Sequence, residues 1–199
     1  MCLSDNINQR ILMDKFFETV SQFTKLSTDG KSALAAVLKR IEFPKGKLLV
    51  KPDTVCNHLY FIEQGLTRTF YFKDGKDITD WLSAENSFAV SIISFITRKA
   101  DRRAIELLEP SVLLSLHFDE LEKLCAAHHD IERMTRHLVS FGLIQLQQKF
   151  DDLHFETALQ RYQTLMTTNP TFIQRVPLGM IASYLGITQE TLSRIRSQI

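Results

Sequence analysis

The chain has 199 residues and a net charge of +1, so it is not a generally basic nucleic-acid coat protein, and any nucleic-acid binding must come from a local patch. Its three cysteines, Cys2, Cys56 and Cys125, are far apart and too few for an iron–sulfur cluster with four cysteine ligands per chain. No stretch resembles a signal peptide or approaches the ~18 apolar residues of a membrane span. The composition therefore predicts a cytoplasmic protein that does not contact the membrane.

The first part of the chain, from about Met13 to Arg40, is predicted to form two helices. The first helix carries its apolar side chains on one side, at Phe16, Phe17, Val20 and Phe23. The second is expected to open at Thr28-Asp29-Gly30, and its apolar residues are Leu34, Val37, Leu38 and Ile41.

From Ile41 to His117 the pattern changes to short β-favouring runs separated by turn residues. The Asp-Gly pair of Lys73-Asp74-Gly75-Lys76 predicts a tight β-hairpin. Many short strands at this spacing indicate an antiparallel β-roll or barrel. The predicted strands are 47–51, 59–62, 66–72, 78–82, 104–108 and 112–116.

A short helix is predicted at Phe118–Ala127, followed by a long helix that Asp130 would cap and that would reach about Leu153. Two apolar seams run along the long helix. The roll needs one of them, so the other is available for a second copy of the chain. The residues predicted for a dimer interface are Met134, Leu138, Phe141, Val139, Leu143, Leu146 and Phe150. The alternative is that a single chain covers both seams.

The closing stretch predicts a helix from about Phe155 to Thr168, a break at Asn169-Pro170, and then two short helices hinged at Gly186. Apolar residues are spaced for one face of each short helix, and Thr188 can cap the second. This is the layout of a helix-turn-helix, whose second helix usually enters the major groove of DNA. The alternative is an ordinary helical hairpin that closes a domain.

A β-roll containing Leu59-Tyr-Phe-Ile-Glu-Gln-Gly65, a long helix and a C-terminal helix-turn-helix resembles the Crp/Fnr family of bacterial transcriptional regulators. The most specific part is the stretch Arg175-Val-Pro-Leu178 with 181–196. The resemblance implies a homodimer in which the roll senses a small molecule and two recognition helices read near-palindromic double-stranded DNA. RNA polymerase is a further candidate partner.

The resemblance also assigns the residues of a DNA-reading surface. Arg194 would donate twice to guanine, and Glu190 would accept from cytosine. Arg196 and Arg175 would contact phosphates. The alternative is that Glu190 and Arg194 form only a surface ion pair. The full predicted surface is Thr188, Gln189, Glu190, Thr191, Ser193, Arg194 and Arg196.

The sensor departs from the cyclic-nucleotide-binding members of the family, which have a Gly-Glu pair at the ribose and an Arg-Ser/Thr-Ala at the phosphate. The corresponding segments are Phe88-Ala89-Val90-Ser91 and Arg102-Arg103-Ala104, and Val90 cannot accept a hydrogen bond from a ribose hydroxyl. The candidate ligand residues are thus Phe88, Ala89, Val90, Arg102 and Arg103. The expected effector is unknown and not cyclic AMP, and no cofactor is identified.

Together these features predict an α+β fold: N-terminal helices, an antiparallel β-roll (cyclic-nucleotide-binding-like, a double-stranded β-helix), a long dimerisation helix, and a helix-turn-helix with no wing after it. The expected domains are the sensor roll with its flanking helices, residues 1–129, the dimerisation helix, 130–153, and the DNA-binding domain, 154–199. We expect no enzyme activity, no catalytic residues and no metal ligands. One alternative is a β-roll protein that acts through a protein partner. The other, a cupin-like metal enzyme, lacks the His-x-His cluster that such enzymes need.

Overall fold

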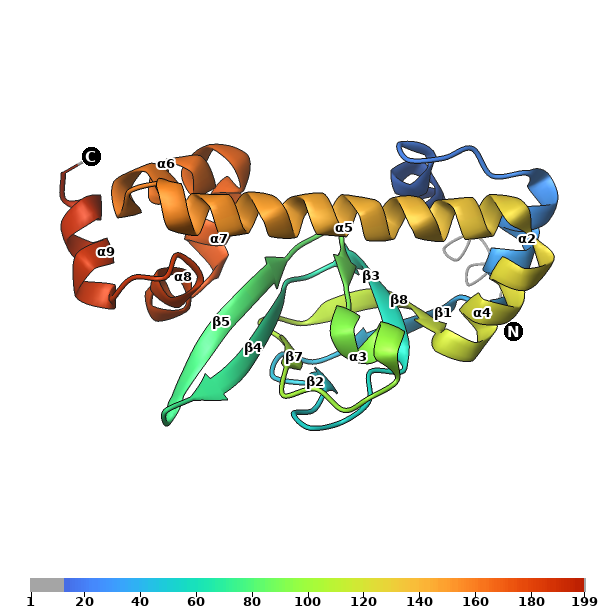
Figure 1. The fold of residues 1–199 in the computed structure, drawn as a ribbon, viewed down its shortest axis with the longest axis horizontal. Coiled ribbons are helices and arrows are strands. Elements are labelled where there is room, and N and C mark those ends of the chain that lie inside the picture. The colour runs from blue at the N-terminus through green and yellow to red at the C-terminus, as the bar shows by residue number, and fades with distance from the viewer. Residues whose placement is uncertain (1–12, 199) are drawn as a thin grey trace.

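The computed structural model describes residues 13–198. Its longest element is α5 (His129–Phe155), which runs almost the length of the molecule (Figure 1). The β-roll lies against one side of α5, the N-terminal helices lie at its start, and the C-terminal helices gather at its end. Among the described residues, no helix combines the length and apolar character that a membrane crossing requires.

The roll consists of two four-stranded sheets in which every pair of neighbouring strands is antiparallel. One sheet has the order β1-β8-β3-β6 and the other the order β2-β7-β4-β5. The strands are β1 (Lys39–Phe43), β2 (Leu48–Val50), β3 (His58–Gln64), β4 (Thr67–Lys73), β5 (Lys76–Ser83), β6 (Phe88–Ala89), β7 (Ala104–Leu107) and β8 (Ser111–His117). The predicted mixed α+β fold with an antiparallel roll is confirmed.

The predicted hairpin is also present. Lys73 pairs with Lys76, and the two residues between them have positive φ, 51° at Asp74 and 73° at Gly75. These values are typical of a type I′ turn, whose twist suits a two-residue hairpin.

One N-terminal prediction is wrong. The second helix does not include Leu38 or Ile41: α2 (Thr28–Val37) ends earlier, and Ile41 lies in β1. The backbone of Lys39–Phe43 pairs with β8, so sheet formation overrides the helical spacing of the apolar residues. The short strand β6 and the helix α3 (Ile92–Thr97) that follows it were not predicted either.

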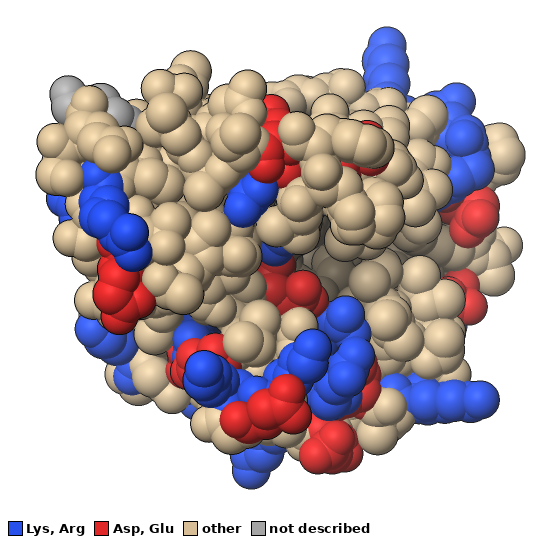
Figure 2. All heavy atoms as spheres, turned by 60° about the vertical axis from the view of Figure 1, so that its left-hand side comes forward, with Lys and Arg blue, Asp and Glu red and all other residues tan. Residues whose placement is uncertain are grey.

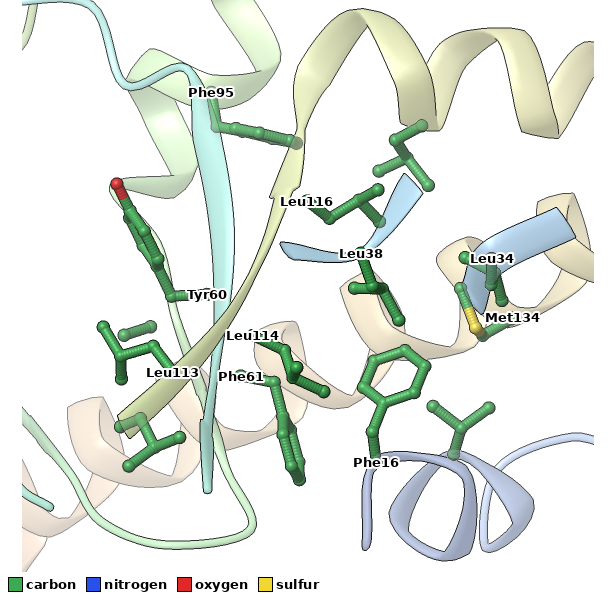
Figure 3. Close-up of a cluster of buried hydrophobic side chains, with 14 of the residues drawn as sticks. Phe16, Leu34, Leu38, Tyr60, Phe61, Phe95, Leu113, Leu114, Leu116 and Met134 are labelled. Atoms are coloured by element: carbon green, nitrogen blue, oxygen red, sulfur yellow. The ribbon is translucent and has the colours of Figure 1, made fainter. Parts of the chain in front are cut away.

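The core of the roll joins both sheets to the flanking helices. Figure 3 shows Phe16, from the helix at residues 13–21, directed into a cluster that includes Leu38, Leu114 and Phe61. The rings of Phe16 and Phe61 meet edge to face, with their centroids 5.4 Å apart. Met134 of α5 is 1% exposed and belongs to the same core. The first half of α5 is therefore fixed to the roll by burial of apolar surface.

The predicted helix α4 (Phe118–Ala127) is confirmed, but Asp130 does not cap α5. The N-cap residue is His128, and Asp130 lies inside the first turn. Its carboxylate instead accepts from the backbone N–H of Ser27 at 2.7 Å, and Ser27 is the N-cap of α2. Asp130 thus connects two helices that are distant in sequence.

The C-terminal helices form a second, smaller hydrophobic core. Thr157 and Gln160 make a capping box that starts the first of them, later than the predicted start at about Phe155. An additional helix follows Asn169, where only a break was predicted, because Pro170 suits the first helical turn. The four helices are α6 (Ala158–Thr168), α7 (Pro170–Arg175), α8 (Leu178–Tyr184) and α9 (Gln189–Arg196).

Candidate nucleic-acid interface and sensor roll

Helices α8 and α9 are joined by the tight turn that the sequence predicted. Gly186 has φ 68°, and the hydroxyl of Thr188 accepts from the backbone N–H of Thr191 at 3.2 Å. The predicted apolar positions of both helices are buried: Ile181, Leu185, Leu192 and Ile195. Because burial uses the whole apolar side of α9, the opposite side of this helix is the one left for solvent.

The residues predicted to read DNA lie together on that outer side. Thr191 is half-buried, and the other six are exposed: Thr188, Gln189, Glu190, Ser193, Arg194 and Arg196. Hydrogen bonds from its own backbone N–H and from Thr188 lower the pKa of Glu190, which favours the carboxylate as an acceptor. In the described structure Glu190 and Arg194 form no ion pair within 4.0 Å. Both side chains are therefore available to a partner.

The C-terminal end of the molecule is not strongly basic. In Figure 2, which turns this end toward the viewer, lysine and arginine side chains are separated by uncharged surface and often lie beside acidic ones. This agrees with the net charge of +1. A DNA-binding role would thus depend on a few well-placed side chains rather than on a broad basic field.

The expectation that Arg175 would be free to contact phosphate is wrong. Its guanidinium donates to both carboxylate oxygens of Glu85, at 2.8 and 2.9 Å, and from Nε to Glu109 at 3.2 Å. Both acids belong to connections of the roll, so Arg175 joins the C-terminal helices to the roll. A guanidinium that carboxylates already pair in this way has little left to offer a phosphate.

The five candidate ligand residues lie at the two ends of the segment that includes α3. Phe88 and Ala89 form β6 and pair with Phe61 and Tyr60 of β3. Val90 is half-buried and packs against the core of the roll. The first three candidates therefore contribute to packing and leave only backbone groups for polar contacts.

Arg102 and Arg103 differ in their surroundings. Arg102 lies over the ring of Tyr71, with 5.2 Å from Cζ to the centroid. Arg103 donates from Nε to Asp80 at 2.7 Å and from a terminal nitrogen to Asp101 at 3.2 Å. Two carboxylates thus compensate the charge of Arg103.

Asp101 also accepts from the hydroxyl of Ser91 at 3.0 Å, and so connects the two candidate segments. Sequence reasoning missed Asp80 and Asp101 as members of this site, whereas Ser91 belongs to the aligned segment but was not named as a candidate ligand residue. Asp101 directly precedes Arg102-Arg103, and this was the one local signal that could have suggested it.

A lysine lies at the junction of the roll, the long helix and α8. The ammonium of Lys149 donates to the backbone carbonyl of Asp80, and it lies 4.1 Å from the ring centroid of Tyr184 and 5.3 Å from that of Trp81. Burial lowers the pKa of Lys149 to about 8, although the nearby Asp80 carboxylate opposes this shift. Asp80 therefore contacts Arg103 through its carboxylate and Lys149 through its backbone.

We expect the free energy of unfolding to rise by about 1–2 kcal/mol between about pH 8 and about pH 10. The folded-state pKa of Lys149, about 8, lies below the unfolded value of roughly 10.4, so the unfolded chain binds more protons in this window and stability increases with pH. The window closes near pH 10, where unfolded tyrosines begin to ionise. Burial raises the pKa of Tyr60 and Tyr184 to about 12, so the free energy of unfolding falls with pH between about 10 and 12. Urea titrations at several pH values measure the effect, which Lys149→Met should abolish. An equal rise in that variant would assign the effect to another group.

The two apolar seams of α5 have different environments. Ile131 and Met134 are buried in the roll core, and Phe141 packs on Phe23 with ring centroids 5.0 Å apart. Met134 was predicted at a dimer interface, but the domain's own core uses its side chain. The other seam is open to solvent, with residues between 41% and 67% exposed: Val139, Leu143, Leu146, Phe150 and Leu153.

In the part of the chain that the structure describes, no three His, Cys, Asp or Glu side chains gather as metal ligands would.

Comparison with known proteins agrees with this geometry. Residues 40–128 match the family described as cyclic nucleotide-binding domain. The structure of FixK2 from Bradyrhizobium japonicum superimposes with a TM-score of 0.70 at 19% identity, covering 81% of this chain and 84% of that one. This chain therefore shares the fold of FixK2 and of a solved regulator of the Crp/Fnr family.

Two further proteins are similar to the chain. CLP from Xanthomonas campestris, a regulator described as responsive to c-di-GMP, superimposes with a TM-score of 0.66 at 16% identity. The match covers 86% of this chain and 91% of the CLP chain. The regulatory subunit of a cAMP-dependent protein kinase from Debaryomyces hansenii is 28% identical over 120 residues, 60% of this chain. The match spans only 26% of that kinase subunit, about a quarter of its length.

Proposed function

We propose that this Crp/Fnr-fold protein is a homodimeric transcription regulator that binds near-palindromic double-stranded DNA through α9. The observation that carries the proposal is the division of α9 into two sides. Leu192 and Ile195 bury one side completely, while the other presents an uninterrupted polar surface without internal ion pairs. The capped N-terminus of a recognition helix is the part that usually contacts bases.

Dimerisation would use the open seam of α5. Five large apolar residues at helical spacing are exposed there in the single chain. Pairing two copies of α5 along this seam would bury them, and it would place two α9 helices to read half-sites about 34–36 Å apart. We propose the same three units as the sequence suggested: a sensor roll within 1–129, a dimerisation helix within 130–153 and a DNA-binding unit within 154–199.

The effector is proposed to be something other than cyclic AMP, or to be absent. Arg102 stands in place of the family's phosphate-binding arginine and lies over the ring of Tyr71. Asp80 and Asp101 already pair the guanidinium of the neighbouring Arg103. A cyclic nucleotide phosphate would have to displace these carboxylates or lie beside them, and like charges disfavour both outcomes. If an effector exists, changes in the roll would shift the packing of the long helices and so the placement of the two recognition helices.

A second candidate function is a regulator that acts mainly by binding a protein. It would keep the roll and the dimer helix, but it would not need a polar reading surface on α9. Selection of bound sequences from a random DNA pool distinguishes the two functions. We expect an enriched near-palindrome, and the absence of any enriched site would favour the protein-binding function.

The matched substitutions Arg194→Ala and Arg196→Ala test the proposed roles within α9. Arg194→Ala should weaken binding to the selected operator by about 1–3 kcal/mol and relax specificity at one position of each half-site. Arg196→Ala should weaken binding to all sequences alike and reduce the salt dependence, as expected for a phosphate contact. Both residues are exposed, so thermal unfolding should be unchanged. If Arg194→Ala bound the operator as tightly as the parent, the base-reading role of Arg194 would be wrong.

A further inference from the structure

The C-terminal helices pack against the roll and are not attached to it through α5 alone. Their hydrophobic core includes three side chains of the roll, Leu66, Leu82 and Leu108, which are 0%, 4% and 9% exposed. These residues pack in the same cluster as the buried residues of α8 and α9. The roll therefore completes the core of the helix-turn-helix unit.

A polar clamp lies at the border of this shared core. Arg175 ends α7 and donates to Glu85, in the connection between β5 and β6, and to Glu109, in the turn between β7 and β8. The backbone N–H of Gly65 also donates to Glu85, at 2.8 Å. Two separate connections of the roll thus bind a single guanidinium, which restricts rotation as well as separation of the two parts.

The electrostatic environment of Glu85 supports a tightly held contact. Burial alone would favour the neutral acid, but the hydrogen bonds from Arg175 and Gly65 dominate and lower the pKa of Glu85 to about 2. The carboxylate therefore stays ionised and paired at neutral pH.

A second contact sets how α8 lies on the roll. The hydroxyl of Ser183 in α8 accepts from the backbone N–H of Thr79 in β5 at 2.9 Å. This hydrogen bond and the Arg175 clamp hold the helix-turn-helix unit at two points.

The clamp does not hide the proposed reading surface. With the helices docked on the roll, Gln189, Glu190 and Arg194 remain exposed. The docked arrangement is thus compatible with DNA contact, and the clamp would orient the unit rather than block it.

From these contacts we infer that Arg175, held by Glu85 and Glu109, is a positioning residue that determines which half-site spacing the dimer accepts. The inference rests on the proposed function. In a dimer joined along α5, the distance between the two α9 helices depends on how each unit is fixed to its own roll. Moving one half-site by one base pair shifts it by about 3.4 Å and rotates it by about 35°. A clamped unit cannot follow this movement, whereas a unit that keeps only the apolar contacts and the Ser183 hydrogen bond can turn about that remaining attachment.

The test uses the selected operator and two derivatives, in which the half-sites are one base pair closer or farther apart. The parent dimer should prefer its own spacing by about tenfold or more. Arg175→Ala should bind the original operator about tenfold more weakly, because units without the clamp are less restricted and lose more orientational freedom on binding. It should discriminate among the three spacings less than about threefold. Arg175→Lys keeps the charge but cannot bind two carboxylates bidentately. Its preference among the three spacings should therefore lie between that of the parent and that of Arg175→Ala.

The control is Lys123→Ala, which removes an exposed ion pair of similar length, 2.8 Å to Glu120, within the single helix α4. It should keep the parent's spacing preference. Limited proteolysis provides a readout that does not need DNA, since the connection at residues 156–157 should be cut faster in Arg175→Ala than in the control. An unchanged spacing preference in Arg175→Ala, with the parent binding normally, would overturn the inference. If selection with the parent protein enriches no DNA sequence, the proposed function is wrong and the spacing role of Arg175 is wrong with it.

Discussion

The protein with Leu146 replaced by glutamate should be a monomer at concentrations at which the parent is a dimer. Leu146 is 49% exposed in the single chain and lies in the open seam between Leu143 and Phe150. A glutamate there would place a charge among apolar side chains of both copies, and an unpaired buried charge costs several kcal/mol. Operator affinity should fall at least about 100-fold, since a monomer engages one half-site without the avidity of the second.

Light scattering measures the mass, and a gel-shift titration measures the affinity. The matched control is Gln148→Glu, which adds the same charge on an exposed position of α5 that points away from the seam. This variant should remain a dimer. A dimeric mass for Leu146→Glu, or an equal loss of dimer in Leu146→Glu and Gln148→Glu, would show that the seam does not join the two copies.

The parts of the fold that could be predicted from the sequence have local causes. The hairpin at Asp74-Gly75 follows from two adjacent residues that tolerate positive φ, and the turn at Gly186 with its cap at Thr188 follows from the same kind of signal. The long helix follows from apolar spacing sustained over many turns. Each of these signals lies within a few residues of the structure that it specifies.

The errors occur where distant segments decide the outcome. Ile41 has helical spacing from Leu38, yet it lies in a strand because β8, about 70 residues later, offers a partner. Asp130 has the sequence context of a cap, but its carboxylate binds Ser27, 103 residues away. Arg175 was expected at a phosphate, and it binds Glu85 and Glu109, which are 90 and 66 residues earlier. Charged side chains find partners in space, and a single sequence does not show those distances.

The candidate sites divide in the same way. The reading surface of α9 could be predicted because one capped helix presents all of it. The roll site could be predicted only in outline, since the partners that neutralise Arg103 come from β5 and from the segment before β7. The substitutions at Ala89 and Val90 suggested a changed pocket, but they did not show that carboxylates occupy the surroundings of the arginine.

Gly65→Ala should destabilise the protein by about 3–4 kcal/mol, a loss of roughly 10 °C in melting temperature. Gly65 has φ 116°, a conformation that residues with a Cβ rarely adopt. A Cβ at this position would also lie 2.5 Å from the Cβ and 2.9 Å from the Cα of Ser111. Because one of these atoms is backbone in the central strand β8, rotation of a side chain cannot relieve the contact, and the sheet itself must move.

The comparison that isolates this crowding is Gly75→Ala. Gly75 also has a positive φ, 73°, but nothing lies within 4 Å of its added Cβ, so only the conformational cost of about 1 kcal/mol applies. Thermal and urea unfolding of both variants measures the difference, and Ser111→Gly should restore part of the stability of Gly65→Ala. Similar losses of stability in Gly65→Ala and Gly75→Ala would mean that backbone conformation alone, without crowding, explains why glycine is needed at position 65.

The effect of Gly65→Ala should also reach the C-terminal helices. The N–H of Gly65 donates to Glu85, and Glu85 holds Arg175, so displacement of this turn removes a fixed point of the clamp. Gly65→Ala should therefore relax the half-site spacing preference as Arg175→Ala does, whereas Gly75→Ala should leave that preference unchanged. The glycine that ends the Leu59-Tyr-Phe-Ile-Glu-Gln-Gly65 motif would then be required for two reasons, the close approach of β8 and the docking of the helices that are proposed to read DNA.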